Sequence, residues 1–387
     1  MIRNRLPALA LALAALAGTG AAQAVAGPTP GSTPGPADTP SPVPSPVPSP
    51  APSESPTQSD GTLQILAYRG YAEYGGISPQ ANWTGTFEKD TGCRLARIDT
   101  VQTPEEMSAK LAGHAYDLVS AGPVLAAELI EARKVQPVDA GRVDGYDDIP
   151  ERLRDLVADG DTVYGVPFLW GYHEFLYDTS RVKGGDLADV FGSDRVMLRD
   201  SPLTLADVAL AGGAEDPFEL DAERLGQAAE RLEATPGRTF WTNQLDLVKG
   251  FANGSVDYGQ ATPHLRELLV RARQPVKAVA APRVTGWVDS WMLGAGVTAT
   301  DCAYHWLNRM TGTDAQRDAA AWNGLAPANT KACKGRARSV CEAYGATRSN
   351  RLDRVVFATR PPGDCRPPKG ECADYAAWSQ RWRELVD

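Results

Sequence analysis

The sequence has no excess of positive charge, few histidines and no Cys-x-x-Cys pair, and each absence argues against a class of function. Its 387 residues carry 39 Lys+Arg against 48 Asp+Glu, a net charge of −9. Nucleic-acid binding needs clustered positive charge, so nucleic acid is not expected as a partner. The four histidines are scattered without ligand spacing, and no Cys-x-x-Cys pair occurs. We therefore expect no metal and no cofactor.

Residues 1–26 are typical of an export signal. Two arginines precede an apolar run from Leu6 to Ala17, and an Ala-x-Ala site follows at Ala22-Gln23-Ala24. The first cysteine is Cys93, far behind the apolar run, so we do not expect a lipoprotein. The prediction is cleavage and release outside the cell. An uncleaved anchor that tethers the protein to the membrane is the alternative, because about 20 weakly interrupted apolar residues are enough to span a bilayer.

Residues 27–61 are rich in proline and serine, with a repeated Pro-Ser-Pro-Val pattern. Proline removes backbone donors and nothing apolar here can form a core, so we predict a disordered, extended linker. The remaining roughly 330 residues exceed what one hydrophobic core usually supports, which predicts about two domains.

The six cysteines favour disulfides in an exported chain. Cys365 and Cys372 lie close together in a polar loop, and so do Cys333 and Cys341, so we predict the pairs Cys365–Cys372 and Cys333–Cys341. Elimination leaves Cys93–Cys302. Buried thiols remain the alternative for this last pair.

Strand and helix patterns alternate along the folded part. The apolar run at residues 63–67 predicts a buried strand, and further strands are expected at 93–98 and 116–119. Between these strands a helix from Ser78 to Gly92 and another at 104–111 are expected. A second strand and helix set follows the apolar segment Gly165–Gly171, and Gly286–Met292 has the pattern of a return crossover. The fold class is α/β.

A set of short motifs in this order resembles the solute-binding proteins of bacterial ABC importers, specifically the spermidine/putrescine-binding group. The motifs span nearly all of residues 62–387 and are Ala67-Tyr68-Arg69-Gly70-Tyr71, Phe87–Gly92, Tyr116–Val119, Gly165–Gly171, Leu198-Arg199-Asp200-Ser201-Pro202, Gly286–Trp291 and Ala326–Asn329.

That resemblance implies a two-lobe, type II periplasmic-binding-protein-like fold with a hinge of two crossover strands. Lobe 1 is expected to comprise residues 62–167 and 287–387, with part of 320–350 packing on lobe 2, and lobe 2 residues 168–286. It also implies a monomeric, non-catalytic protein that captures a small-molecule solute and delivers it to an importer's permease.

The resemblance also implies ligand-binding residues. Trp287 and Asp289 match the family's stacking Trp and ammonium-binding Asp, and a strand places both on one face. Tyr68 matches another stacking aromatic, at the sheet edge where α/β proteins bind ligands. The alternative is that Trp287 belongs to the core and Asp289 caps a turn.

Other positions depart from the polyamine pattern. Arg69 replaces a small polar residue and would suit an anionic group, unless it points to solvent or pairs with an acid. Around Asp200 only one acid is left, Thr204 takes the place of a second, Gly122-Pro123-Val124 lacks the family's aromatic, and the residues near Thr262 lack its Trp. These departures leave room for one amine rather than several.

Three further residues are candidates from their position alone. Trp170 follows the first crossover, and Trp241 and Asn243 stand at the start of a helix, where backbone amides attract anions. For both tryptophans a place in the core is equally expected. The histidine His173 is expected to be an ordinary surface or supporting residue.

The sequence therefore predicts an extracellular binding protein for a small aminated solute, polyamine-like or zwitterionic. An enzyme on the same scaffold, similar to the thiamin-cleaving enzymes, is an alternative that needs a reactive cysteine in the cleft. A membrane-tethered ligand sensor is a third hypothesis.

Overall fold

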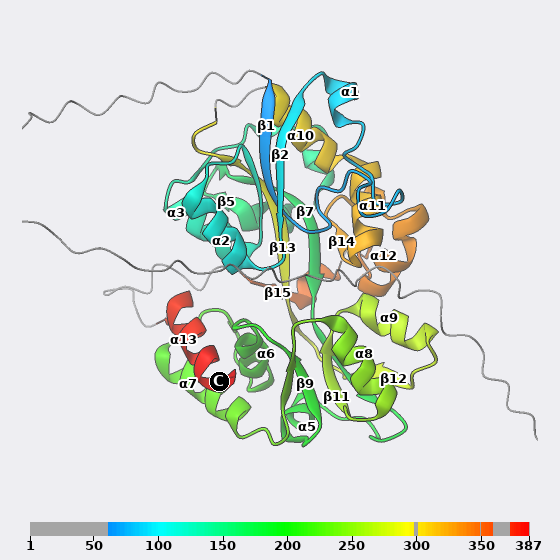
Figure 1. Ribbon diagram of the computed structural model, residues 1–387. Coiled ribbons are helices and arrows are strands. Elements are labelled where there is room, and N and C mark those ends of the chain that lie inside the picture. The colour runs from blue at the N-terminus through cyan, green and yellow to red at the C-terminus, as the bar shows by residue number, and fades with distance from the viewer. Residues whose placement is uncertain (1–60, 298–300, 349, 359–371, 387) are drawn as a thin grey trace, which may run out of the picture. The chain divides into compact units, whose positions relative to one another are not determined.

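The computed structural model describes residues 61–297, 301–348, 350–358 and 372–386. Two β-sheets, each covered by helices, divide the described residues into two lobes (Figure 1). We call the elements around the eight-stranded sheet the first lobe and those around the five-stranded sheet the second lobe. The α/β class and the two-lobe fold are therefore confirmed.

The first sheet has the strand order β14-β7-β13-β3-β1-β2, with β15 and β4 also paired to β13. Its strands are β1 (Thr62–Tyr68), β2 (Arg94–Val101), β3 (Leu118–Ala121), β4 (Val135–Gln136), β7 (Gly165–Tyr172), β13 (Val284–Gly294), β14 (Ala326–Pro327) and β15 (Val355–Phe357). Strand β1 pairs in parallel with β2 and β3, whereas β13 runs antiparallel to β3 and β7. A hairpin of β5 (Ala158–Asp159) and β6 (Thr162–Val163) stands apart.

Apolar side chains on both faces explain why β1 lies inside this sheet. Leu63, Ile65 and Ala67 pack into one hydrophobic cluster, and Leu66 points into another. Both faces are covered by helices, as parallel strands require. The helices of this lobe are α1 (Phe87–Thr91), α2 (Pro104–Gly113), α3 (Pro123–Glu131), α4 (Glu151–Arg154), α10 (Asp301–Thr311), α11 (Thr313–Asn323) and α12 (Arg338–Tyr344).

The helix predicted from Ser78 onward is wrong over its first part, because α1 begins only at Phe87. The backbone N–H groups of Trp83 and Thr84 donate to the Glu73 carbonyl instead of forming a helical ladder. The predicted end is correct, since Gly92 caps α1 in the left-handed conformation at φ 74°.

The second sheet has the order β10-β9-β11-β8-β12. Its strands are β8 (Glu174–Asp178), β9 (Val196–Arg199), β10 (Thr239–Trp241), β11 (Tyr258–Ala261) and β12 (Val276–Ala278). Strands β9, β10 and β11 are parallel. The helices of this lobe are α5 (Leu187–Gly192), α6 (Thr204–Ala211), α7 (Ala222–Glu233), α8 (Gln244–Asn253), α9 (Pro263–Arg271) and α13 (Tyr375–Val386).

Within the described residues, two connections can be followed from one lobe to the other. Strand β7 of the first sheet continues through His173 into β8 of the second, as expected for the segment around Gly165–Gly171. The return lies between β12 and β13, slightly before the predicted segment, because Gly286–Met292 is paired within the first sheet. The two connections touch where the His173 amide donates to the Thr285 carbonyl.

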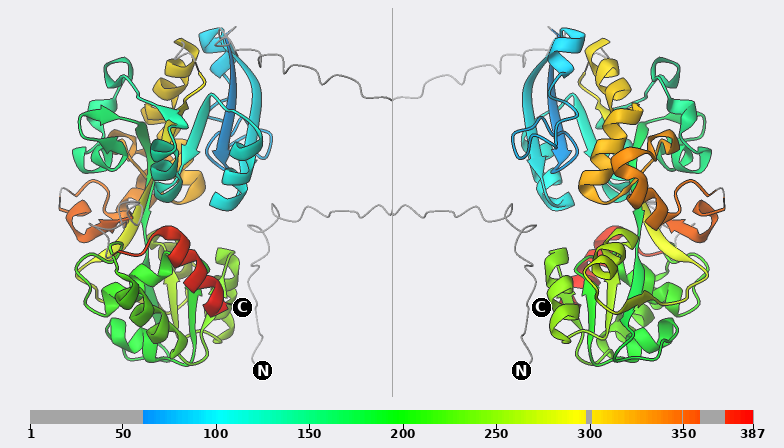
Figure 2. Two further views of the ribbon diagram at one scale, coloured as in Figure 1. Left: turned by 90° about the vertical axis from the view of Figure 1, so that its left-hand side faces the viewer. Right: turned by 90° about the vertical axis from the view of Figure 1, so that its right-hand side faces the viewer.

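The C-terminal helix α13 corrects the lobe assignment of residues 287–387, because it packs on the second lobe beside α7 (Figures 1 and 2). Its apolar side chains Trp378 and Trp382 are buried in the core of the second lobe, and the Trp382 ring meets Phe240 edge-on at 5.1 Å. A Trp pair at i and i+4 forms one apolar face, and that face needs a partner.

Two predicted disulfides are present. Cys93–Cys302 joins the residue before β2 to α10, and Cys333–Cys341 joins the loop before α12 to that helix. Cys365 lies outside the described residues, so Cys365–Cys372 stays a prediction. In the part of the chain that the structure describes, no helix is long and apolar enough to cross a membrane.

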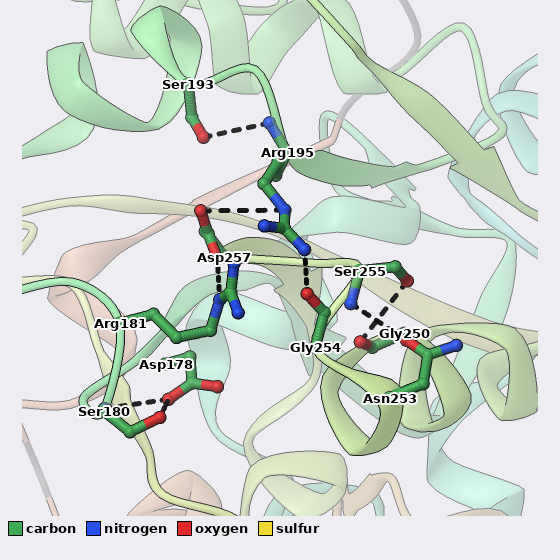
Figure 3. A network of polar contacts seen from close by, with 10 residues as sticks. All are labelled: Asp178, Ser180, Arg181, Ser193, Arg195, Gly250, Asn253, Gly254, Ser255 and Asp257. Carbon is green, nitrogen blue, oxygen red and sulfur yellow. Dashed lines mark hydrogen bonds and ion pairs between the residues drawn. The ribbon is translucent and has the colours of Figure 1, made fainter.

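A polar network ties together the ends of the second sheet that lie away from the cavity described below (Figure 3). Asp257 accepts from Arg181 and pairs with Arg195, whose guanidinium also reaches the Gly254 carbonyl. Asp178 accepts from the Ser180 hydroxyl at 2.6 Å beside it. These groups satisfy one another and fix the loops that lead into β9 and β11.

Candidate ligand-binding site

A cavity of about 380 Å³ lies between the lobes. Its wall includes residues at or just after the carboxyl ends of strands from both sheets, among them Tyr68 in β1, Gly122 after β3, Arg199 in β9, Trp241 in β10 and Thr262 after β11. This edge is where open α/β sheets hold their ligands. The volume is at the lower end of the range for small-molecule pockets, about 300–1,000 Å³.

Trp287 and Asp289 both line this cavity from β13. They are two residues apart on the strand, opposite Gly171 and Leu169 of β7, so their side chains share a face. The indole lies close over Gly171, where a Cβ would come within 2.7 Å of the Trp287 ring. Only a glycine on β7 leaves room for the indole in this position.

The Asp289 carboxylate is buried and held by hydrogen bonds. Its Oδ2 accepts from the Tyr71 hydroxyl at 2.5 Å. Burial raises the pKa of Asp289 to about 6, and the bonds from Tyr71 and Trp287 together with the charge of Arg199 lower it only in part. At pH 7 the carboxylate is mostly ionised, and an ammonium group in the cavity would offset its loss of hydration.

Tyr68 and Trp241 are the other two predicted residues that line the cavity. Burial raises the pKa of Tyr68, so its hydroxyl stays protonated as a donor. The Trp241 indole N–H donates to the Gln260 carbonyl at 3.0 Å, which fixes the ring at the end of β10. Trp241 thus belongs both to the core of the second lobe and to the cavity wall.

Four predicted residues lie outside the cavity wall. Arg69 is exposed. Trp170 is fully buried in the first core, where its N–H donates to the Pro327 carbonyl at 3.2 Å. Asp200 is exposed and its Oδ1 accepts from the Trp382 indole at 2.7 Å, and Asn243 caps α8 by accepting from the Leu245 amide at 2.9 Å. Core packing therefore occupies the side chain of Trp170, the Trp382 indole that of Asp200, and the helix cap that of Asn243.

The cavity contains charged groups that the sequence did not single out. Arg199 enters it from the end of β9 and Asp207 from α6. The position of Arg199 at a strand end was the available signal, because the same rule selected Tyr68. For Asp207 the signal was one acid in the otherwise apolar helix Thr204–Ala211.

Asp207 is almost completely buried, and both its oxygens are occupied. Oδ1 accepts from the Thr285 hydroxyl at 2.6 Å and Oδ2 from the Gln260 amide at 2.7 Å. Burial raises the pKa of Asp207 to about 7, against the lowering effect of Thr285 and Arg199. This carboxyl group is therefore partly protonated at neutral pH.

His173 also lines the cavity and is buried there, so of its two expected roles, surface or supporting residue, the surface role is wrong. Its ring lies 4.8 Å from that of Trp287, at an interplanar angle of 35°. Burial, together with the charge of Arg199, lowers the pKa of His173 well below its usual range. The imidazole is neutral at pH 7 and provides an aromatic neighbour for Trp287 rather than a charge.

Comparison with known proteins agrees with this architecture. The family model described as bacterial extracellular solute-binding protein matches residues 82–337. The chain belongs to this family. Its members bind small molecules outside the cytoplasm and are not enzymes, so the protein is a non-catalytic binding protein.

Solved structures with the same fold include transport proteins for amines. The putative spermidine/putrescine ABC transporter of Listeria monocytogenes is 16% identical with a TM-score of 0.64, over 84% of this chain and 99% of that one. A spermidine/putrescine substrate-binding protein of Streptococcus pneumoniae is 15% identical with a TM-score of 0.63, over 84% and 97%. The Atu4243-GABA receptor is 16% identical with a TM-score of 0.61, over 84% and 95%. At these identities the likeness shows the fold.

Proposed function

We propose that this protein is the substrate-binding component of an ABC importer and captures a small solute that carries an amino group. The observation that carries the proposal is the buried Asp289 carboxylate in the cavity wall beside Trp287. A carboxylate next to an aromatic ring suits an ammonium group, because ion pairing and cation–π attraction act on the same charge. Three structural neighbours are named for spermidine/putrescine or GABA, all of which carry amino groups.

The route of the solute follows from the two lobes. Closure about the connections at His173 and between β12 and β13 would seal the cavity, and the closed, monomeric protein would dock on the permease. Residues 1–26 would direct export, and residues 27–61 would act as a spacer between the N terminus and the lobes. A thermal-shift screen of polyamines and amino acids would identify the solute.

The Asp289→Asn variant tests the amine. It keeps the size of the side chain and removes its charge, so affinity for an amine found in the screen should fall about 10- to 150-fold. The exposed Asp144 offers a matched control, since Asp144→Asn changes the net charge by the same amount away from the cavity. Isothermal titration calorimetry that gives equal affinity for wild type and Asp289→Asn would contradict the proposal.

The thiamin-cleaving alternative needs a reactive cysteine thiol, and among the described residues there is no free cysteine. The tethered sensor differs from a released protein in keeping residues 1–26. Mass spectrometry of the N terminus of the exported protein distinguishes the tethered sensor from the released protein. A terminus after Ala24 or Ala26 supports release, and an intact Met1 in membrane fractions supports the sensor.

A further inference from the structure

Among the described residues, the guanidinium of Arg199 has no hydrogen-bond or ion-pair partner in the cavity. Its backbone is fixed, since the amide donates to Gln260 Oε1 and the carbonyl accepts from the Thr204 hydroxyl. The side chain lies with its guanidinium carbon 5.6 Å from the Trp287 ring. Within the described ranges the guanidinium forms no hydrogen bond and no ion pair, although it is partly buried. All five of its N–H donors are therefore left unused by the described residues.

The two nearest acids do not serve as its partners. The carboxylate of Asp207 accepts from Thr285 and Gln260, one bond to each oxygen. The carboxylate of Asp289 accepts from Tyr71. Both acids influence Arg199 through space, since burial lowers its pKa and their charges raise it, but neither forms an ion pair with it. The donors of Arg199 are therefore available to a solute.

The backbone around Arg199 also favours negative charge. Helices α3, α6, α8 and α9 all begin at the cavity wall, which includes residues of their first turns or the residues just before them. Helix N-termini carry partial positive charge and present free N–H groups. The N-cap of α3 is Gly122, which has no side chain to occupy those groups.

Arg199 and Asp289 both line the cavity and both interact with Trp287. Asp289 is hydrogen-bonded to the Trp287 side chain, and Arg199 lies over its ring. A short solute along the Trp287 indole can therefore reach the carboxylate with one end and the guanidinium with the other. A second ammonium group at the guanidinium end would be repelled by the like charge of Arg199.

We propose that Arg199 binds a carboxylate of the solute, and that the protein is specific for amino carboxylates rather than polyamines. This inference rests on the proposed function of the same cavity, in which Asp289 binds the amino group. Arg199 takes the role that the sequence assigned to Arg69, which is exposed. Arginine suits a carboxylate because its planar fork can donate two parallel hydrogen bonds.

The test uses four probes matched in carbon chain, with chains of three to six carbons: the alkylamine, the alkyl carboxylate, the ω-amino carboxylate and the diamine. Binding to the purified full-length chain is measured by calorimetry. The amino carboxylate should bind tightest. Arg199→Gln should weaken it about 10- to 100-fold, change the affinity for the alkylamine far less and tighten the diamine. Arg199→Lys keeps the charge and should retain part of the affinity.

Arg94→Gln is the matched control, because Arg94 is exposed on β2 and lies outside the cavity wall. Circular dichroism of each variant checks folding. If amines bind through Asp289 and Arg199→Gln leaves the amino carboxylate unchanged, the inference is wrong and the proposed function stands. If the alkyl carboxylates bind and the alkylamines do not, the proposed function, which requires an amino group, is wrong. If none of the four kinds of probe binds, both the proposed function and this inference are wrong.

Discussion

The Tyr71 hydroxyl donates a 2.5 Å hydrogen bond to Oδ2 of Asp289 and so joins the loop after β1 to strand β13. Both side chains are buried, and both line the cavity. Burial raises the pKa of Asp289 to about 6, and the bond from Tyr71 is among the influences that lower it. Tyr71 therefore helps to keep the carboxylate ionised at neutral pH, which is the form that can bind an ammonium group.

The Tyr71→Phe variant tests this relationship. Wild-type affinity for an alkylamine should decrease as pH falls through about 6, because Asp289 takes up a proton there. Without the hydroxyl donor the pKa rises further, so the midpoint of the pH–affinity curve should move upward, by about one unit for the loss of a hydrogen bond of about 1.5 kcal/mol.

Tyr116→Phe is the control for this experiment. It removes a similar bond to a carboxylate, that of Asp99, away from the cavity wall. Calorimetric titrations from pH 5 to 8 should show an unchanged midpoint for this variant. A midpoint that Tyr71→Phe also leaves unchanged would show that the hydroxyl does not control the ionisation of Asp289.

The fold could be predicted where local pattern and tertiary structure agree. The apolar run at residues 63–67 lies in the largely buried strand β1, and the helix predicted at residues 104–111 begins at Pro104 in the structure. The errors arose where distant contacts decide. The segment after Ser78 folds back on Glu73 instead of forming a helix, and α13 joins the second lobe through Trp378 and Trp382. No local pattern shows which of two cores will accept a tryptophan pair.

The candidate site was predictable to a similar extent. The period of two along a strand placed Trp287 and Asp289 on one face at the cavity. Trp170 also belongs to an apolar segment beside a crossover, but its side chain packs in the first core. A tryptophan at such a position fits a core and a cavity wall equally well, so the sequence could not decide between them. Whether these residues bind a solute stays a prediction.

The two arginines show what sequence order cannot decide. Arg69 and Arg199 both stand at the end of a parallel strand, but only Arg199 reaches the cavity. Tyr68 is the last residue of β1 and lines the cavity, whereas Arg69, the next residue, lies outside the cavity wall. Arg199 is the last residue of β9 and so corresponds to Tyr68. A shift of one position exchanges the cavity for solvent.

The stability of the solute-free protein should depend on pH through Asp207. Its pKa is about 7 in the folded state and 3.8 ordinarily, so the folded state holds a proton that the unfolded chain releases above about pH 4. The free energy of unfolding should therefore fall as pH rises from about 4 to 7, by on the order of 4 kcal/mol.

Asp207→Asn should remove most of this decrease. Asparagine can still accept from Gln260, and the Thr285 hydroxyl can reverse to accept from the new amide. Urea unfolding between pH 4 and 9 measures the effect. Asp289→Asn should remove a smaller part, since the pKa of Asp289 is about 6. Parallel stability curves for wild type and Asp207→Asn would refute the assignment.

The two disulfides should contribute unequally to stability. Cys93–Cys302 joins residues 209 positions apart, whereas Cys333–Cys341 spans 8. Loop-closure entropy predicts about 5 kcal/mol for the first and about 2–3 kcal/mol for the second. Replacing both cysteines of each pair by serine should lower the melting temperature more for Cys93/Cys302, and an equal decrease would argue against the entropic origin.

Mass spectrometry without reduction should also show a Cys365–Cys372 cross-linked peptide.

The position of the Trp287 ring should depend on Gly171. A Cβ at residue 171 would lie 2.7 Å from the Trp287 ring and 3.0 Å from Leu325, so even alanine must displace the indole. Since the ring supplies the aromatic contact to Arg199 and a hydrogen bond to Asp289, its displacement disturbs both proposed ends of the solute site. Gly171→Ala should weaken an ω-amino carboxylate about 10-fold or more, the equivalent of one lost stacking contact of about 1.5 kcal/mol.

Gly113→Ala is the control, because a Cβ at residue 113 meets nothing within 4 Å. It adds the same methyl group to the same lobe and should leave affinity unchanged. Trp287→Ala then separates two explanations of a loss in Gly171→Ala. If the new methyl group acts through the indole, it should have little further effect once the indole is gone, and the double variant should bind like Trp287→Ala alone. Additive losses would mean that Gly171 acts on the cavity by some other route, such as the hinge between β7 and β8.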